Sequence, residues 1–416
     1  MSILSILGIS LSNFLQLLIF LNGIFYLFLM LTGSIILRKK KNSGSADNKK
    51  IAVLVAAHNE ENVISFFLES VLKADYPKDK LEIYAVLDHC SDKTQEICLK
   101  YPVNIILRNA KEAKPGKAAA LNYATQKIGA DNFDAFCYFD ADSLMHPSFL
   151  KKCSYLLNKG ALAVQGKQVS KNPNDCWLAR IISVGQIISA VFFQKPKYFL
   201  GLSATFHGKG ICLEKNIVKN FLWDENCLTE DLEMQMRLIS QGIFIHWAEE
   251  AVVYDEQPVN IKQYMKRTIR WTRGSLDTAK KHLKGLFLRF LRKKDIKALE
   301  GFVYCANVYR LSLAGITAIL IYLNLNEFNF LVWIYKSIPG ARLTLKLFFL
   351  SPLVIIPFAI LIIEKAGFKM LIAYFMQPIL GIFRIPTFIG GIFKDRINWD
   401  RTEHSSAVAI GDIVKK

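Results

Sequence analysis

Two aspartates, Asp140 and Asp142, come directly after the apolar run Ala135–Phe139, which has the length of a buried strand. Side chains two positions apart on an extended chain point the same way, so both carboxylates can hold one hard divalent cation at the strand end. Such a cation needs further anionic oxygens, which a diphosphate supplies. Turn-forming aspartates are the alternative, because an Asp-x-Asp pair alone is a weak signal. At a strand end, the pair predicts a metal site for a diphosphate ligand.

Acidic residues also follow two other predicted strands. Glu60 comes shortly after Ile51–Ala57, and Asp88 comes directly after Leu81–Leu87. The carboxyl ends of parallel strands share the ligand-binding edge of a sheet, so both acids are candidates for lining a nucleotide pocket. The alternative is structural, because acids in the first turn of a helix interact favourably with its dipole.

A lysine opens the next predicted helix. Lys117 follows the turn Lys114-Pro115-Gly116 and begins a helical pattern over about 116–128, after the predicted strand Val103–Leu107. A cation in the first helical turn opposes the helix dipole, so Lys117 is better explained if an anion binds there. A solvated lysine in a turn is the alternative.

Two acids, Glu230 and Asp231, precede the predicted helix Leu232–Leu238. A positioned carboxylate is what activation of a hydroxyl by general base catalysis requires. The alternative is a Thr229 cap followed by two acids in the first turn, which accounts for the local pattern.

A fifth group combines two arginines with an aromatic. Arg267 and Arg270 are three positions apart on one predicted helical face, and Trp271 is beside them. Arginine can bind phosphate oxygens and tryptophan can stack on a sugar ring. An amphipathic surface segment is the alternative.

The elements that must position these residues alternate between about 50 and 260. Helical spacing at 60–74 and 91–100 separates runs of strand length, and the pattern continues to the strand that ends at Phe139. Strands separated by helices predict a parallel sheet with crossover connections, whose ligands bind beyond the carboxyl ends of the strands. The sheet would therefore gather the candidate residues at one edge.

Apolar segments flank this region. Residues 11–37 carry no charge and are long enough to cross a hydrocarbon core as a helix. The basic cluster Arg38–Lys41 predicts that the following segment is cytosolic. The composition agrees, since 52% of the residues are hydrophobic and the mean hydropathy is +0.24.

Further membrane elements are predicted towards the carboxyl terminus. Spans are expected near 301–323 and 345–363, and Asn307 and Arg310 in the first should face protein, a substrate path or the interface. Residues 367–393 are apolar but broken by two prolines and an arginine. They predict an interfacial or re-entrant piece, with a full crossing as the alternative.

The charge distribution and the cysteines indicate the binding partners and the redox compartment of the protein. The net charge of +18 comes from Lys and Arg clustered beside apolar segments, which predicts an anionic lipid surface and not nucleic acid as the partner. Lys280–Lys294 has one apolar and one basic face at helical spacing, as in a helix lying on a membrane, although a surface helix of the catalytic domain has the same pattern. The eight cysteines form no CxxC pair and predict reduced thiols in a cytosolic setting.

Taken in this order, the motifs resemble the family 2 glycosyltransferases, in particular the membrane-bound branch of hyaluronan, poly-N-acetylglucosamine, chitin-oligosaccharide and cellulose synthases. The resemblance covers about residues 50–275 closely. It implies an α/β GT-A-like nucleotide-sugar-binding domain with a Rossmann-like mixed sheet, joined to N- and C-terminal transmembrane and interfacial helices. It also implies an inverting transfer that depends on Mg²⁺ or Mn²⁺.

The resemblance assigns the donor side as follows. Asp88 is similar to the aspartate that contacts the uridine base, with Glu60 nearby, and Lys117 is similar to a lysine close to the nucleotide. Asp140 and Asp142 match the metal-diphosphate motif, with Asp142 as the more direct ligand of the cation.

On the acceptor side, Asp231 matches the general base, with Glu230 beside the acceptor. Arg270 and Trp271 match the end of the Q-x-x-R-W motif, in which the arginine faces the diphosphate and the tryptophan floors the acceptor site. The chain departs from the motif at Arg267, where the processive synthases usually have glutamine, and this leaves long-polymer synthesis open.

The carboxyl-terminal segment Trp399–His404 is similar to a W-x-x-T-x-H segment found after the last membrane element in this branch. This likeness implies a cytosolic tail, so residues 367–393 could not be a simple single crossing. The resemblance further implies a nucleotide-sugar donor, a carbohydrate or glycolipid acceptor, and a plasma-membrane protein that could work with an export or regulatory subunit. The expected organisation is a transmembrane helix with a basic stop at 1–41, a linker at 42–50, the catalytic domain at 51–275, an interfacial helix at 276–300, a membrane region at 301–393 and a tail at 394–416.

Overall fold

The computed structural model describes residues 3–36, 47–110, 115–323, 327–359, 367–394, 404 and 406–414. Three sequence-based predictions lie outside these residues: the basic cluster at 38–41, most of the linker at 42–50, and residues 399–403 of the W-x-x-T-x-H segment. The turn residue Lys114 and the last part of the span predicted at 345–363 also lie outside.

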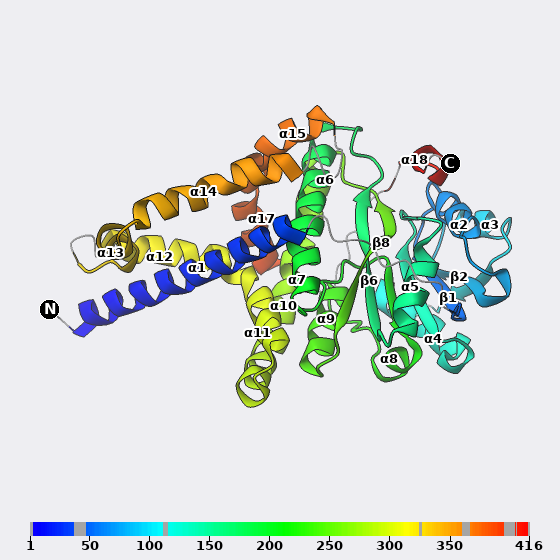
Figure 1. Cartoon of the computed structure of the whole chain (residues 1–416). Coiled ribbons are helices and arrows are strands. Elements are labelled where there is room, and N and C mark those ends of the chain that lie inside the picture. Colours follow the sequence, from blue (N-terminus) through cyan, green and yellow to red (C-terminus); the bar gives the residue numbers. More distant parts are fainter. Residues whose placement is uncertain are drawn as a thin grey trace.

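A mixed sheet forms the centre of the catalytic region (Figure 1). Its spatial order is β3-β2-β1-β4-β7-β6-β8-β5. The strands are β1 (Ile51–Ala57), β2 (Leu81–Asp88), β3 (Asn104–Arg108), β4 (Ala135–Asp140), β5 (Leu144–Met145), β6 (Ala163–Ser170), β7 (Ile211–Glu214) and β8 (Ile245–Asp255). The first four are parallel neighbours, as the alternation of strands and helices predicted. The second half is mixed, because β7 is antiparallel to both β4 and β6, whereas β6 and β8 are parallel.

Helices cover both faces of the parallel half of the sheet. Val53 packs in one apolar cluster with Phe67, while its neighbour Leu54 packs in another with Leu121. This alternation explains why β1 is an uninterrupted apolar run, since a strand buried on both faces has no solvent side. The helices of this region are α2 (Ile64–Leu72), α3 (Thr94–Cys98), α4 (Lys117–Ile128), α5 (Phe149–Asn158), α8 (Lys215–Asn220) and α9 (Glu230–Ser240).

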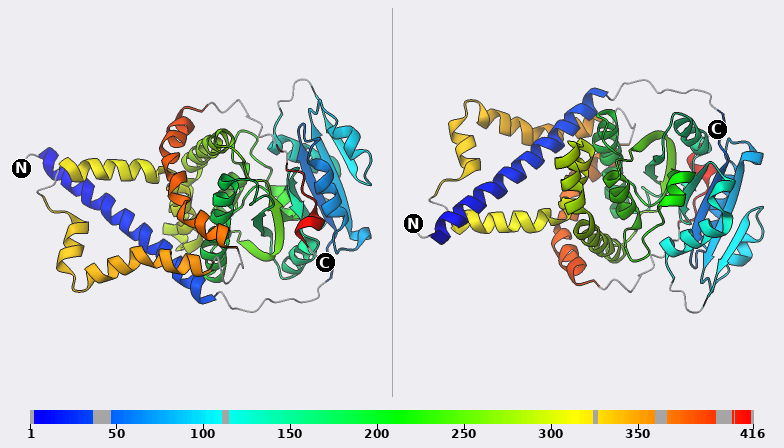
Figure 2. Two further views of the ribbon diagram at one scale, coloured as in Figure 1. Left: turned by 90° about the horizontal axis from the view of Figure 1, so that it is seen from above. Right: turned by 90° about the horizontal axis from the view of Figure 1, so that it is seen from below.

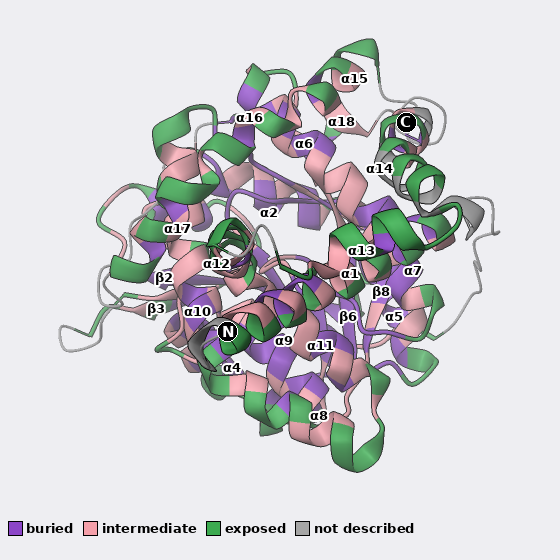
Figure 3. Ribbon diagram, turned by 90° about the vertical axis from the view of Figure 1, so that its left-hand side faces the viewer, coloured by how far each residue is buried: buried purple, intermediate pink, exposed green. Residues whose placement is uncertain are grey.

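Long helices extend from the catalytic region towards one side (Figures 1 and 2). They are α1 (Ile3–Ile36), α12 (Arg310–Leu323), α13 (Phe330–Ser337) and α14 (Ala341–Phe358), whereas α11 (Ile296–Ala306), directly before α12, packs against α9 and α10 (Ile261–Lys293). Within the described residues, Ile6–Gly33 and Ile296–Leu323 are long and apolar enough to cross a membrane. Figure 2 shows α1, α12 and α14 splayed apart, and Figure 3 shows exposed surface along these helices. Such exposed apolar faces suit lipid contact.

A third helical stretch of sufficient length and apolarity, Trp177–Phe199, was not predicted from the sequence. It comprises α6 (Trp177–Ser189), a π-helical turn at Ala190–Gln194 and α7 (Lys195–Phe199). Half of it is buried inside the protein. Ala204, only a few residues beyond its end, already donates a hydrogen bond to Ile245 of β8. The chain leaves the sheet before this stretch and rejoins it shortly after. We therefore interpret the stretch as a helix lying along the catalytic region.

One helix, α10 (Ile261–Lys293), runs through the boundary predicted at 275. Its second half, which includes the segment predicted to lie on a membrane, buries Leu286 against Ile239 of α9. Its first half packs on α17 (Arg384–Phe393), where a side chain at Gly391 would come within 2.5 Å of Thr272. Arg273 also donates a hydrogen bond to the carbonyl of Ile392 at 3.0 Å. Helix α10 is therefore fixed on both sides.

The apolar segment at 367–393 is bent. It contains α15 (Phe368–Phe375), α16 (Gln377–Ile382) and α17, and the two parts on either side of Phe383 are bent by 44°. After it, the chain returns to the catalytic region, where α18 (Ile410–Ile413) packs near α2 (Figure 2). The described part of the carboxyl-terminal segment thus lies against the catalytic region.

Candidate active site

The two aspartates of the Asp-x-Asp pair lie where β4 ends. Asp140 is the last residue of β4, and Asp142 follows in the next turn with only 3% of its surface exposed. They share one neighbour, Lys209, whose Nζ lies 3.4 Å from Asp140 Oδ2 and 3.6 Å from Asp142 Oδ2. The same Nζ lies 3.5 Å from Asp255 Oδ2 at the end of β8. Sequence reasoning missed both Lys209 and Asp255.

The opposite charges of this cluster stabilise one another's ionised forms. Burial alone would raise the pKa of Asp142, but Lys209 and His404 hold it well below its usual range. Burial would likewise lower the pKa of Lys209, but Asp142, Asp255 and Asp140 outweigh it and raise the pKa. The carboxylates are therefore ionised and the lysine is charged at neutral pH.

Lys117 connects the Asp-x-Asp pair with the acids of α9. At the start of α4, its Nζ forms an ion pair with Asp140 and lies 3.5 Å from Glu230 Oε1. It also donates a hydrogen bond of 2.6 Å to the carbonyl of Gly208. The structure thus brings together the strand-end acid Asp140 and the first-turn acids Glu230 and Asp231 around a cation at a helix N-terminus, where an anion would also be stabilised.

Asp231 lies in the first turn of α9, where its Oδ1 accepts a hydrogen bond from the Leu232 backbone N–H at 2.8 Å. Burial, followed by the charge of Glu230, raises the pKa of Asp231 to about 7. The start of α9 is held by a close helix contact, because a side chain at Gly274 of α10 would come within 2.5 Å of Thr229 Oγ1. A carboxyl with this pKa is matched to taking up a proton near neutral pH.

Asp88 lies at the end of β2 and is bonded on both carboxylate oxygens. Oδ1 accepts from Arg108 at 2.6 Å and lies 2.9 Å from Nδ1 of His89, and Oδ2 accepts from the Gly116 N–H at 2.7 Å. Its bond to Gly116 fixes the turn directly before Lys117. The Asp88 side chain is therefore linked to the cluster indirectly, through the turn that precedes Lys117.

Glu60 meets a residue from the far end of the chain. Nδ1 of His404 lies 3.1 Å from Glu60 Oε2, and Nε2 of His404 lies 3.7 Å from Asp142 Oδ2. Burial alone would lower the pKa of His404, but Asp142 and Glu60 outweigh it and raise the pKa. Just beyond, Ser406 N donates to Glu256 Oε2 at 3.1 Å. The W-x-x-T-x-H likeness is the sequence signal for His404, although from it only the location of the tail was predicted.

The arginines and tryptophan lie along α10. The guanidinium of Arg267 stacks 4.7 Å from the ring centre of Trp271 and donates to Gln257 Oε1 at 3.1 Å. Trp271 is 47% exposed. Among the described residues, Arg270 has no hydrogen bond or ion pair. The structure does not place Trp271 or Arg270 in contact with the acidic cluster.

One feature of the cluster fits a divalent cation. Oδ1 of Asp142 is buried and has no hydrogen-bond partner among the described residues. Within the same residues, no three His, Cys, Asp or Glu side chains are grouped closely enough to hold a metal by themselves. Two carboxylates with a free buried oxygen suit Mg²⁺ or Mn²⁺, which commonly complete their coordination with substrate phosphates.

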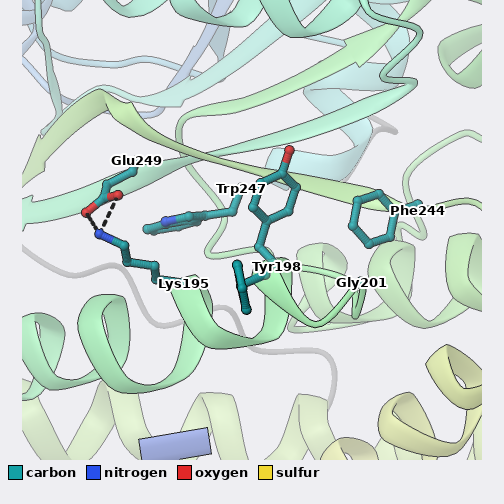
Figure 4. A pocket seen from close by; sticks show the side chains of 7 residues that line it. Lys195, Tyr198, Gly201, Phe244, Trp247 and Glu249 are labelled. Atoms are coloured by element: carbon teal, nitrogen blue, oxygen red, sulfur yellow. Dashed lines mark hydrogen bonds and ion pairs between the residues drawn. The ribbon is translucent and has the colours of Figure 1, made fainter. Parts of the chain in front are cut away.

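A separate cavity of about 530 Å³ lies at the opposite end of β8 (Figure 4). Aromatic side chains line it next to the ion pair between Lys195 and Glu249, whose nearest atoms are 3.0 Å apart. None of the residues predicted from the sequence to be functional lines this cavity. It is therefore distinct from the acidic cluster.

Comparison with known proteins gives the family. A family model described as "Glycosyltransferase like family 2" matches residues 48–274, which is more than half of the chain. The chain is 29% identical over 267 residues to the probable glycosyltransferase YdaM of Bacillus subtilis, covering 61% of this chain and 62% of that protein. It is 26% identical over 196 residues to the beta-monoglucosyldiacylglycerol synthase of Trichormus variabilis, covering 45% and 41%. These two alignments span less than two thirds of the relatives' own length.

A longer alignment joins the chain to the poly-beta-1,6-N-acetyl-D-glucosamine synthase of Staphylococcus epidermidis, with 25% identity over 299 residues, 69% of this chain and 70% of that protein. Among solved structures, the mannosyltransferase PcManGT from Pyrobaculum calidifontis, in complex with GDP-Man and Mn²⁺, superposes with a TM-score of 0.55. That superposition covers 93% of this chain and 99% of the other, at 15% identity. At this identity the likeness concerns the fold alone.

Proposed function

This chain belongs to the family 2 glycosyltransferases, and from that premise we propose that it transfers a sugar from a UDP-sugar to a carbohydrate acceptor at a membrane surface. The fold is the GT-A glycosyltransferase fold that the sequence motifs implied, and it carries helices that could span a membrane. The observation that supports the proposal most is the convergence of Asp140, Asp142 and Asp231 around Lys117 and Lys209.

In the proposed mechanism, the two lysines, together with Arg270, bind the diphosphate of the donor. Asp231 takes the proton from the acceptor hydroxyl, whose oxygen displaces the nucleoside diphosphate at the anomeric carbon in one inverting step. A divalent cation held by Asp140 and Asp142 would supply positive charge for the departing diphosphate. Glu230 and Trp271 hold the acceptor, and Glu60 and Asp88 support the nucleotide side of the site.

A glycolipid acceptor is the second candidate. Arg267 is bonded to Gln257 and stacked on Trp271, at the position where the resemblance to processive synthases breaks down. The similarity to a glucosyldiacylglycerol synthase supports the same candidate. We propose that either acceptor is met at the cytosolic face of the plasma membrane, and that an export or regulatory subunit could take part in polymer synthesis.

The proposed function is tested by screening UDP-sugars and other nucleotide sugars with the purified full chain in membranes. Release of free nucleoside diphosphate, together with a radiolabelled product, identifies the donor. Sizing that product decides between acceptors, because a single-sugar lipid product excludes the polymerase interpretation. If no nucleotide sugar is consumed in the presence of Mn²⁺ or Mg²⁺, the proposal is wrong.

The pKa of Asp231 predicts the pH dependence of the reaction. The base must be ionised, and burial beside Glu230 raises its pKa to about 7, so kcat/KM should rise with pH through about 7 and level off above it. On the acidic side, kcat/KM should fall by about tenfold per pH unit. A rate profile between pH 5.5 and pH 9 checks this expectation. A flat profile would contradict the role of Asp231 as base.

The substitution Arg267→Gln restores the residue usual in processive synthases. It removes the cation stacked on Trp271, and on the polymerase interpretation it should be tolerated or lengthen the product. On the single-transfer interpretation it should leave product size unchanged. Gel or chromatographic sizing of radiolabelled product measures the difference. Lys266→Gln, on the exposed side of the same helix, is the matched control.

A further inference from the structure

Three carboxylates from two parts of the chain, the end of β4 and the end of β8, surround the ammonium group of Lys209. Asp140 at 3.4 Å, Asp255 at 3.5 Å and Asp142 at 3.6 Å are almost equally distant from it. The ammonium group thus lies between the three carboxylates and not on any one of them. A cation shared by several carboxylates occupies the kind of position that a metal ion takes.

The backbone holds Lys209 in this position. Its neighbours Gly208 and Gly210 have φ values of +76° and +64°, which other residues rarely adopt. Gly210 N donates to the carbonyl of Tyr138 in β4, and the carbonyl of Lys209 accepts from Gln165 Nε2 at 3.0 Å. The side chain is 13% exposed. The ammonium group of Lys209 is therefore held in a fixed position next to the sheet, unlike that of a mobile surface lysine.

The other lysine of the cluster has different partners. Lys117 is bonded to Asp140, lies near Glu230 and donates to the carbonyl of Gly208. Lys209 lies within ion-pair distance of both Asp142 and Asp255, and His404 Nε2 also lies 3.7 Å from Asp142 Oδ2. If a divalent cation bound to Asp140 and Asp142 while Lys209 stayed in place, two cationic centres would lie a few ångströms apart.

We propose that Lys209 is an internal cation that occupies the metal site of the donor-free enzyme, so that a divalent cation binds tightly there only together with the diphosphate donor. The diphosphate brings the negative charge that allows both cations to remain, and its oxygens become the new partner of Lys209. The inference rests on the proposed function, in which Lys209 binds the diphosphate of the donor. Because coupling between two ligands is reciprocal, the metal should strengthen nucleotide binding by the same factor.

The test is a Mn²⁺ titration of the detergent-solubilised full chain, followed by electron paramagnetic resonance, with and without UDP as the diphosphate probe. Wild type should bind Mn²⁺ weakly alone and much more tightly with UDP. Lys209→Met removes the competing charge, so Mn²⁺ alone should bind at least roughly tenfold more tightly than in wild type. The strengthening by UDP should shrink correspondingly.

Two further variants separate charge from structure. Lys209→Arg keeps the charge and should keep the wild-type coupling. Lys219→Met removes a lysine that pairs with exposed Asp131 at 2.7 Å on the surface, and it should change nothing. If Lys209→Met does not fold, Lys209→Gln keeps the length and polarity and should show the same tighter binding of Mn²⁺ alone.

Mn²⁺ binding without UDP that is no tighter in the neutral variants than in wild type would overturn this inference, provided UDP still strengthens binding to wild type. A wild-type protein that binds no Mn²⁺ even with UDP would instead contradict the metal-dependent function on which the inference rests. The two failures are therefore distinguishable in one titration series.

Discussion

Replacing Asp231 with asparagine should lower turnover by roughly 10²–10⁴-fold, the usual cost of losing a general base. The change keeps the size of the side chain and the oxygen that accepts from Leu232, and it removes only the basic group. Donor binding should be nearly unchanged, because the diphosphate is proposed to contact the lysines and Arg270. Single-turnover rates with radiolabelled donor, beside equilibrium binding of UDP, measure the two effects separately.

Folding is not expected to limit this experiment. Burial raises the pKa of Asp231 to about 7, so the folded protein is more stable with this carboxyl protonated. That contribution is present below the ordinary carboxyl pKa and is lost as pH rises through about 7, where a neutral asparagine avoids the loss. Asp131→Asn, at an exposed ion pair, is the matched control. Loss of UDP binding in Asp231→Asn would assign Asp231 to the nucleotide pocket instead.

Replacing Asp142 with alanine should reduce transfer to background, a loss of roughly 10³-fold or more, because charge stabilisation at a departing group is usually the largest single contribution. Asp142 supplies a buried oxygen without a hydrogen-bond partner among the described residues, and one remaining carboxylate cannot hold the ion well. Mn²⁺ binding in the presence of UDP should fall with the rate. Both quantities can be measured on the same preparation.

Removing the divalent cation with a chelator tests the same metal dependence. Wild-type activity should vanish in excess chelator and return when Mn²⁺ or Mg²⁺ is added, whereas Asp142→Ala should not recover. Asp131→Ala removes an aspartate from the surface and should behave as wild type. Full turnover of the wild type in excess chelator would exclude the metal-dependent mechanism.

The sequence was sufficient to predict the first half of the sheet and the acids at its edge. The strand β4 is a buried apolar run, so the position of Asp140 and Asp142 after it follows from local pattern alone. The helix starts at Lys117 and Glu230 were predicted to within two residues from helical spacing, although neither Gly116 nor Thr229 makes a side-chain capping hydrogen bond.

The rest of the cluster depends on long-range contacts that no local pattern encodes. Lys209 is flanked by two glycines and looks like part of a turn, and its role arises only when antiparallel β7 pairs with β4. Asp255 is placed by the end of a strand that pairs with β6 across a register shift. His404 reaches Glu60 from a segment more than three hundred residues away. The stretch Trp177–Phe199 is apolar enough to cross a membrane, but half of it is buried within the catalytic region, a contact that its local pattern does not encode.

The contacts of α10 set how far the proposed base lies from the bent apolar segment at 367–393. Gly274 leaves no space between this helix and Thr229 next to the proposed base, and Gly391 leaves none between the helix and the bent apolar segment. The helix therefore keeps the proposed base, Asp231, at a fixed distance from the proposed interfacial helices. For an acceptor anchored in the bilayer, the distance between its anchor and its hydroxyl would then decide which acceptors can react. Only a hydroxyl at one height above the anchor would contact Asp231.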